Sequence, residues 1–270
     1  MLNTLIDAGS NRHLPILPTD RVISLVPSLT ELIIDLGCAK QLVGRTKFCI
    51  HPRDAVTSIQ IVGGTKQVDF DKIIRLGATH AIVNKDETPK DLADNLATLG
   101  LKIVVTHPNK LRENRDLFQL IGGILNASEP SKKMEVSFDK ALSDLGQKAK
   151  NWTQKQVLYL IWQNPWMSIG RDTYIADVLV NAALNPISHA SEARYPVIEI
   201  NERLLGSIDY ILFSTEPFPF SEKHLTNFRE TFPEHASKAH SINAEMVSWY
   251  GSRAIPGLRY LTKFRDEMEK

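Results

Sequence analysis

The chain has 270 residues, of which 43% are hydrophobic and 23% are charged, a composition typical of a folded globular protein and not of a disordered one. Its 32 basic and 31 acidic residues leave a net charge of +1 without any long basic run, which argues against a nucleic-acid partner. No apolar stretch approaches the roughly 18 residues of a membrane-spanning helix, so the protein is not expected to cross a membrane.

The N-terminal segment and the cysteines bear on the compartment. The segment contains an acid, Asp7, and lacks the basic start and the long apolar run of a secretory signal. Two cysteines, Cys38 and Cys49, are too few for a disulfide framework. These features predict a cytoplasmic protein, with the periplasm or the cell surface as the alternative if the N-terminus was trimmed.

The first half of the chain alternates short apolar runs with helix-like segments. The run at 21–25 predicts a strand, and Ser28 and Glu31 predict a capping box at the start of the helix that follows. Thr88 before Pro89 predicts the N-cap and first residue of a later helix. The other predicted elements are strands at 41–46, 80–83 and 102–106 and a helix near 69–76. This alternation predicts a doubly wound α/β domain with a parallel sheet.

A long helical pattern follows at 131–150, with apolar residues at helical spacing on one side. A helix of 20 residues would be about 30 Å long, enough to connect two lobes, although a long surface helix within one domain fits the same pattern. The predicted division is an N-terminal α/β lobe at 1–127, a connecting helix at 128–152 and a C-terminal α/β lobe at 153–270.

The second half repeats the strand and helix alternation. Strands are predicted at 157–162 and 209–214, and helices near 173–184, near 201–205, from Ser221 and near 253–268. The segments 76–89 and 205–218 match at four positions with one offset, and one of the matched pairs is Glu87 with Glu216. This weak internal similarity favours two related lobes.

Aromatic and basic residues gather in the loops after the predicted strands, where parallel sheets bind ligands. The rings predict an aromatic cleft between two lobes, although each could instead fill the core. These rings are Phe48, Trp162, Trp166, Tyr195, Phe218, Phe220, Trp249 and Tyr250. The cations there could bind an anionic ligand, but ion pairing is the commoner role. They are Arg45, Lys47, Lys66, Lys85, Arg171, Lys223 and Arg253.

Cys49 and His51 lie two residues apart and raise the question of a metal site or a nucleophile. A zinc site needs about four ligands, and no second cysteine or histidine pair completes one. The sequence identifies no base or orienting group for a cysteine nucleophile, so a buried, unreactive thiol is the commoner reading. The chain also lacks the glycine-rich fingerprints of phosphate and dinucleotide sites and the GxSxG motif of hydrolases.

The motifs, taken in order, resemble the helical-backbone metal receptor superfamily. These class III solute-binding proteins include the vitamin B12-binding protein of bacterial cobalamin importers. The resemblance spans roughly 20–261 and rests mainly on RVISLVPSLTELIIDLG, VGRTKFCIHP, VGGTK, GRDTYIADVL, RYP, TEPFPFSEKH and SWYGSR. It implies two α/β lobes joined by a long helix, a ligand cleft between them, little hinge motion and no catalysis.

The resemblance also implies roles for individual residues. Positions that match the family's ligand cleft are Phe48, Thr65, Asn84, Ile161, Met167 and Tyr195. Thr65 and Asn84 stand where relatives have rings, while other rings lie nearby, so the ligand could differ from cobalamin. Family members dock on a transporter through one acid on each lobe, and the corresponding positions here are Asp71 and Asn201, with Glu202 beside the latter.

The sequence thus predicts a monomeric, non-enzymatic solute-binding protein without an intrinsic cofactor or metal. Its ligand would be a cobalamin-like corrinoid or a metal chelate such as a ferric siderophore or haem, and an ABC permease is a possible partner. The predicted ligand-binding residues are Phe48, Thr65, Lys66, Asn84, Trp162, Trp166, Arg171, Tyr195, Trp249, Tyr250 and Arg253, and the predicted docking acids are Asp71 and Glu202. The alternatives are a cytosolic family member without a transporter, an enzyme using Cys49 and His51, and a scaffold without a small ligand.

Overall fold

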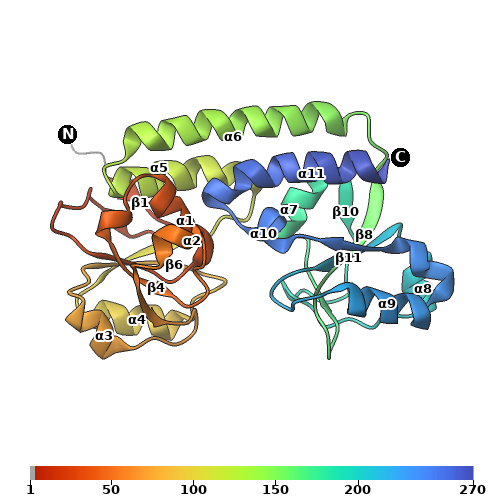
Figure 1. Cartoon of the computed structure of the whole chain (residues 1–270), viewed down its shortest axis with the longest axis horizontal. Helices are drawn as coiled ribbons and strands as arrows, with labels where there is room; N and C mark the ends of the chain where they lie inside the picture. Colours follow the sequence, from red (N-terminus) through yellow and green to blue (C-terminus); the bar gives the residue numbers. More distant parts are fainter. Residues whose placement is uncertain (1–3, 270) are drawn as a thin grey trace. The chain divides into compact units, whose positions relative to one another are not determined.

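The computed structural model describes residues 4–269 and divides into two compact α/β units, each with its own sheet (Figure 1). Unit 1 contains the described chain up to Pro108, together with Arg112–Phe138 and Tyr250–Arg253. Unit 2 contains Asn109–Leu111, Asp139–Trp249 and the chain from Ala254 onward. The chain therefore returns to unit 1 for four residues near its C-terminal end.

Unit 1 has a five-stranded parallel sheet with its first strand in the centre. The strands are β3 (Val22–Ser24), β4 (Leu42–Thr46), β5 (Gln60–Gly63), β6 (His80–Asn84) and β7 (Lys102–Thr106). Their order in the sheet is β5-β4-β3-β6-β7, and all neighbouring pairs are parallel. Because the chain winds outward from β3 in both directions, the sheet is doubly wound, as the sequence predicts.

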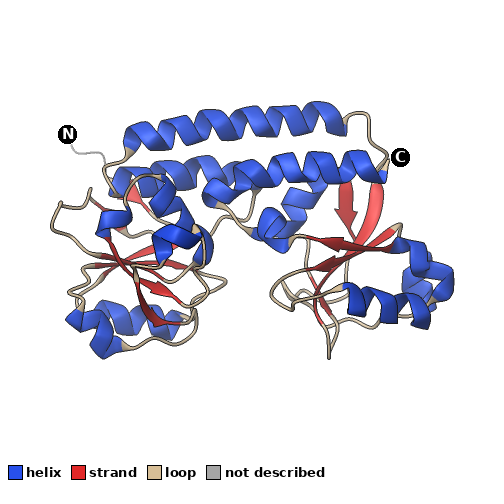
Figure 2. Cartoon of the chain, in the orientation of Figure 1, coloured by secondary structure: helices blue, strands red, loops and turns tan. Residues whose placement is uncertain are grey.

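Helices cover both faces of this sheet (Figure 2). The helical segments are α1 (Pro27–Asp35), η1 (Ala39–Gln41), α2 (Arg53–Val56), α3 (Phe70–Arg75), α4 (Lys90–Thr98), α5 (Asn114–Ile124) and η4 (Gly251–Arg253), with η2 (Leu111–Glu113) before α5. On one face, Ile73 of α3 and Leu96 of α4 pack against Ile23, Val62 and Val83 of the strands. A short hairpin, β1 (Leu5–Ile6) with β2 (Arg12–His13), precedes the sheet.

Unit 2 has a second sheet of the same kind. Its parallel strands lie in the order β10 (Leu184–Pro186), β8 (Lys155–Trp162), β11 (Tyr210–Ser214) and β12 (Ala239–Ile242), and β9 (Met167–Ser168) pairs antiparallel with β8. Its helical segments are α7 (Tyr174–Asn181), α8 (Glu202–Gly206), α9 (Glu222–Thr231), η3 (Pro233–Lys238), α10 (Ala244–Ser248) and α11 (Ala254–Met268). Leu205 of α8 and Phe228 of α9 pack on Leu158, Leu160 and Phe213 of the sheet.

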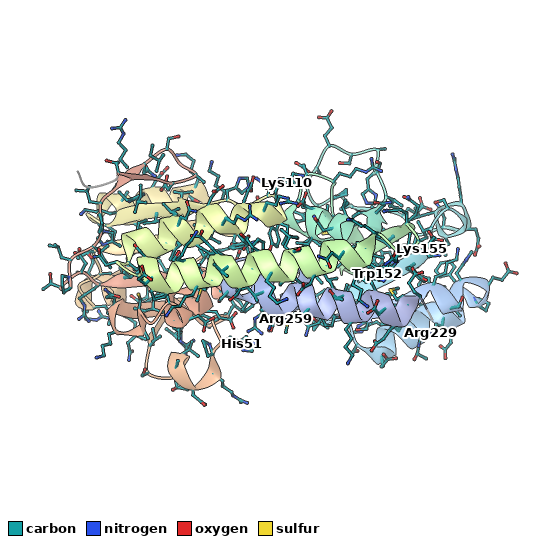
Figure 3. All side chains as sticks on the ribbon, turned by 90° about the horizontal axis from the view of Figure 1, so that it is seen from above. His51, Lys110, Trp152, Lys155, Arg229 and Arg259 are labelled. Atoms are coloured by element: carbon teal, nitrogen blue, oxygen red, sulfur yellow. The ribbon has the colours of Figure 1, made fainter. Side chains whose placement is uncertain are left out.

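The predicted long helix is α6, which covers Ser128–Ala149. Its 22 residues correspond to a rod about 33 Å long. The part up to Phe138 belongs to unit 1, and the part from Asp139 onward belongs to unit 2. Trp152, labelled in Figure 3, follows the helix, and its indole Nε1 donates to Asp266 of α11 at 3.1 Å. The predicted boundaries at 127 and 153 stay a prediction.

Two predicted helix starts are wrong in detail. α1 has Val26 as its N-cap and Pro27 in its first turn, so Ser28 and Glu31 form no capping box. Glu31 is instead bound by Arg253. α4 begins at Lys90 with Pro89 as its N-cap, so Thr88 lies one residue too early to cap it. Both prolines set the boundary through their fixed backbone angle, and that effect outweighs the side-chain capping signal.

Candidate functional site

A groove of about 690 Å³ lies in unit 1, beside the carboxyl ends of β4 and β5. Its walls include Phe48 and Lys47 from the loop after β4, and Ile61 from β5. The rest of the lining comes from residues 63–69, which lead from β5 into α3 and include Thr65 and Lys66. A volume of this size falls within the usual range of small-molecule sites.

The turn at 63–68 gives this groove its shape. The amide of Gly64 donates to the carbonyl of Gln67 at 2.8 Å, and Gly63 forms an isolated antiparallel bridge with Val68. Gly63 has a φ of +138°, a backbone conformation that residues other than glycine rarely adopt. The amide of Lys47 donates to the carbonyl of Gly63 at 2.8 Å, so the loop after β4 is fixed to this turn.

Phe48 is the exposed ring of the groove. Its side chain is 51% exposed, and the ammonium of Lys47 lies 5.1 Å from the ring centroid. The loop holds this position because the buried Arg45 donates from Nε to the carbonyl of Val56 at 2.8 Å and from Nη1 to that of Cys49 at 3.1 Å. Arg45 is therefore a structural residue of this loop.

Cys49 faces the interior of unit 1 beneath that loop. Its side chain is 0% exposed, and its sulfur accepts a hydrogen bond from Oγ1 of Thr30 at 3.1 Å. Burial raises the pKa of the Cys49 thiol, although hydrogen bonds from Thr30 and Thr46 oppose the shift. A neutral, enclosed thiol is a poor nucleophile, which disfavours the predicted enzymatic alternative. Within residues 4–269, no cluster of three or more histidine, cysteine, aspartate or glutamate side chains could hold a metal ion.

In unit 2, Trp162 ends β8 with its side chain 40% exposed. Its ring meets the ring of Phe218 edge to face, with centroids 5.5 Å apart. Phe218 contacts Phe220 at 4.6 Å, and Trp166 stacks on Phe220 at 6.0 Å. Trp166 packs against the hydrophobic core of this unit, so Trp162 and Phe218 form the outer part of a continuous aromatic cluster.

Tyr195 belongs to the same part of unit 2. The segment around it runs beside β9, because Ser168 donates from its amide to Pro196 and Gly170 donates to Arg194. The Tyr195 side chain is 37% exposed. The predicted site residues therefore lie on neighbouring segments of unit 2: Trp162 at the end of β8, Trp166 just before β9, and Tyr195 in the segment that flanks β9.

Trp249 and Tyr250 are buried, at 9% and 6% exposure, although the sequence suggests that they stack on a ligand. The indole of Trp249 donates to Glu216 at 3.2 Å in unit 2, and the hydroxyl of Tyr250 donates to Glu87 at 2.7 Å in unit 1. Glu87 and Glu216 are the two acids that the internal repeat aligns. Burial, followed by the charge of Glu87, raises the pKa of the Tyr250 hydroxyl well above its usual value.

The other predicted ligand residues differ in their surroundings. Asn84 is 2% exposed, and its side chain accepts the amide of Asp86. Arg253 makes two hydrogen bonds to Glu31, at 2.8 and 2.6 Å. Arg171 is exposed in unit 2. Ligand contact by any of these residues stays a prediction.

Each of these surfaces contains a residue that is absent from the predicted site. Ile61, which is 44% exposed, lines the groove of unit 1 but belongs to β5, a strand that the sequence analysis did not identify. The β-branched pair Ile61 and Val62, followed directly by Gly63 and Gly64, is the sequence signal that indicates this strand. Phe218 is one of the predicted loop rings but not one of the predicted ligand-binding residues, because its contact with Trp162 is visible only in the folded chain.

Comparisons with known proteins place the chain among binding proteins. The family model described as periplasmic binding protein matches residues 22–242. The vitamin B12-binding protein of Vibrio cholerae (strain O395) is 24% identical over 200 residues, which cover 74% of this chain and 71% of that protein. The crystal structure of the Vibrio cholerae vitamin B12-binding protein BtuF matches with a TM-score of 0.81 at 19% identity, covering 94% of this chain and 99% of that one. The periplasmic heme-binding protein RhuT from Roseiflexus sp. RS-1 matches with a TM-score of 0.77 at 17% identity, covering 92% and 98%.

These matches confirm the predicted resemblance and the predicted α/β fold class. They also confirm the predicted class of function, a solute-binding protein and not an enzyme. The predicted cytoplasmic location finds no support in a family described as periplasmic. Within the described chain, no helix combines the length and the apolar character needed to cross a membrane.

Proposed function

Because this chain belongs to the periplasmic binding protein family, we propose that its solute is a metal chelate with a flat or apolar body, of the corrinoid, haem or ferric siderophore kind. The observation that carries the proposal is the presence of exposed rings at the carboxyl ends of parallel strands in each unit. Phe48 follows β4 in unit 1, and Trp162 ends β8 in unit 2. Exposed rings of this size at strand ends supply apolar contact area for a ligand.

The names of similar proteins support this ligand class without fixing one member of it. One relative is a vitamin B12-binding protein and one solved structure is a heme-binding protein, and both ligands are metal-containing tetrapyrroles. We propose that the protein works outside the cytoplasm, that it needs no cofactor of its own, and that the metal enters only as part of the ligand.

The test is a set of absorbance titrations of the purified protein with cobalamin, cobinamide, haem and ferric siderophores. A saturable spectral change with at least one of them is expected. Failure of every member of the set to bind would contradict the proposed ligand class.

Trp162→Ala is expected to weaken binding of that ligand by about 2 kcal/mol, or roughly thirtyfold, because it removes the exposed ring of unit 2. The fold should be preserved, since 40% of the Trp162 side chain is already exposed. Trp162→Phe is the matched control and should retain most of the affinity, because the smaller ring still packs on Phe218. The same absorbance titration measures the affinity of both proteins. If the alanine variant binds as tightly as the unmodified protein, Trp162 does not contact the ligand.

We propose further that an ABC permease recognises one acid on each unit. Asp71 is exposed in the first turn of α3 in unit 1, and Glu202 is exposed in the first turn of α8 in unit 2. Asn201 is the N-cap of α8, and its side-chain oxygen accepts a hydrogen bond from the amide of Leu204. Asn201 also carries no charge, so Glu202 is the acid that we assign to permease docking in unit 2. The carboxylate of Glu202 lies 2.9 Å from Nε2 of His235, which fixes its position.

The double variant Asp71→Asn, Glu202→Gln is expected to lower stimulation of the partner permease's ATPase several-fold in reconstituted vesicles, because complementary charge mainly speeds association. Ligand affinity should stay unchanged. Glu129→Gln, an exposed acid in the first turn of α6, is the control with the same type of substitution and should have no effect. Full stimulation by the double variant would contradict the assignment of these acids.

A further inference from the structure

The groove of unit 1 contains two cations that the protein itself does not neutralise. Lys47 and Lys66 both line the groove and both are exposed. Within residues 4–269, neither ammonium takes part in an ion pair or a side-chain hydrogen bond, and the ammonium of Lys47 lies over the ring of Phe48. Two unpaired lysines therefore flank the one strongly exposed ring of this groove.

Other cations near the strand ends of unit 1 have internal roles, which makes this pair distinctive. Arg45 donates to backbone carbonyls of its own loop. Arg253 is held by Glu31, and Lys85 donates to the carbonyl of Ala8 at 2.7 Å. The cations that remain at the groove are those whose charge is available to a ligand.

One acid, Asp69, also lines the groove, and its charge must be weighed against the two lysines. The carboxylate of Asp69 is the N-cap of α3 and accepts the amide of Lys72 at 2.8 Å. Its negative charge is thus partly offset by the backbone amides at the start of that helix. The charged side chains that line the groove, Lys47, Lys66 and Asp69, thus leave a net positive charge.

We propose that this groove selects ligands with acidic substituents, so that the solute is an anionic metal chelate and not a neutral or cationic one. This inference rests on the proposed function and narrows it. An apolar ligand body would lie against Phe48 and Ile61, while carboxylate, sulfonate or phosphate groups at its edge would meet the ammonium groups of Lys47 and Lys66. Tetrapyrroles with free carboxylates and carboxylate-bearing ferric chelates have this chemistry.

Two water-soluble metalloporphyrins of similar size and opposite charge separate charge selection from ring binding. The iron complexes of a tetra-sulfonated porphyrin and of a tetra-pyridinium porphyrin are titrated into the full-length protein, with the Soret absorbance as the signal. The anionic porphyrin is expected to bind about tenfold more tightly or better at low salt, and the difference should shrink as salt is raised. Equal affinities for the two porphyrins would overturn the inference and leave the proposed function standing.

Variants then assign the effect to the two lysines. Lys47→Met and Lys66→Met are each expected to weaken binding of the sulfonated porphyrin about threefold, and the double variant about tenfold. Lys133→Met removes the same charge from an exposed position on α6, where the lysine forms no ion pair within residues 4–269, and it should leave affinity unchanged. Undiminished binding by the double variant would show that the charge preference arises outside the groove and would overturn the inference.

Different results would contradict the proposed function and the charge selection. If neither porphyrin binds and no natural metal chelate binds, the proposed function fails, and this inference fails with it. If cobinamide, which carries no acidic group, binds as tightly as haem and the lysine variants bind both normally, only the charge selection fails.

Discussion

Replacing Arg253 with methionine is expected to lower the free energy of unfolding by about 3–5 kcal/mol, because the change leaves a buried carboxylate without its partner. The side chains of Arg253 and Glu31 are only 13% and 11% exposed, and they share two hydrogen bonds. Arg253 was predicted as a polar anchor for the ligand, yet its guanidinium is already held by Glu31. Urea unfolding followed by circular dichroism measures the loss.

The pH dependence of the stability of Arg253→Met tests whether the unpaired Glu31 carboxylate causes the loss. Burial raises the pKa of Glu31, with Arg253 opposing the shift. Without Arg253 that pKa rises further above its value in the unfolded chain, so proton uptake favours the folded state as pH falls. The loss of unfolding free energy caused by Arg253→Met should therefore be smaller at about pH 5 than at about pH 8.

Two further variants test the pair directly. Glu31→Gln combined with Arg253→Met should cost much less than the sum of the single changes, because neither variant partner then carries a buried charge. Lys90→Met breaks an exposed pair with Asp94 and should have no measurable effect on stability. Loss of ligand affinity with unchanged stability in Arg253→Met would instead support its role as a ligand anchor.

Gly63→Ala is expected both to destabilise unit 1 by about 2–4 kcal/mol and to reduce ligand affinity tenfold or more. A Cβ atom at Gly63 would lie against the carbonyl oxygen of Gln67 and 2.7 Å from Cα of Val68, and both are backbone atoms that cannot rotate away. The φ of +138° adds strain for any residue with a side chain. The turn must open, and Thr65 and Lys66 then move out of the groove.

The adjacent glycine supplies the control. A Cβ atom at Gly64 would meet the edge of Phe48 at 3.5 Å and the carbonyl oxygen of Gln67 at 3.9 Å, and both are ordinary contacts. Gly64→Ala should therefore change stability by no more than about 0.5 kcal/mol. Urea unfolding and the absorbance titration with the best-binding chelate measure both effects. Similar behaviour of the two variants would show that the turn does not depend on the backbone of Gly63.

Most of the long or strongly patterned elements could be predicted from the sequence. The strand predicted at 102–106 has the bounds of β7, and the helix predicted from Ser221 is α9, which begins one residue later with Ser221 as its N-cap. α5 was missed even though its apolar residues have helical spacing, and β5 was missed because it is short and two of its four residues are exposed. Short elements depend on their neighbours in the sheet, and that information is absent from a local pattern.

The candidate site was less accessible to prediction. Exposure separates Phe48 and Trp162, which are open to a ligand, from Trp249 and Tyr250, which are not. Loop position alone cannot make that distinction, because it does not reveal Glu87 and Glu216 as partners of the two buried rings. The same holds for the cations, since the partner of Arg253 lies 222 residues away.

The return of Tyr250–Arg253 to unit 1 also has a consequence for how the chain matures on the ribosome. Tyr250 binds Glu87, the amide of Gly251 donates to Asn114, and Arg253 binds Glu31, so unit 1 is completed by residues that are synthesised well after Phe138. At roughly 5–20 residues per second, the interval between the emergence of Phe138 and that of Tyr250 is on the order of ten seconds. Throughout that time the nascent half lacks three of its internal contacts. A polypeptide terminated shortly before Tyr250 would therefore lack these contacts in unit 1, the unit that contains its N-terminal half.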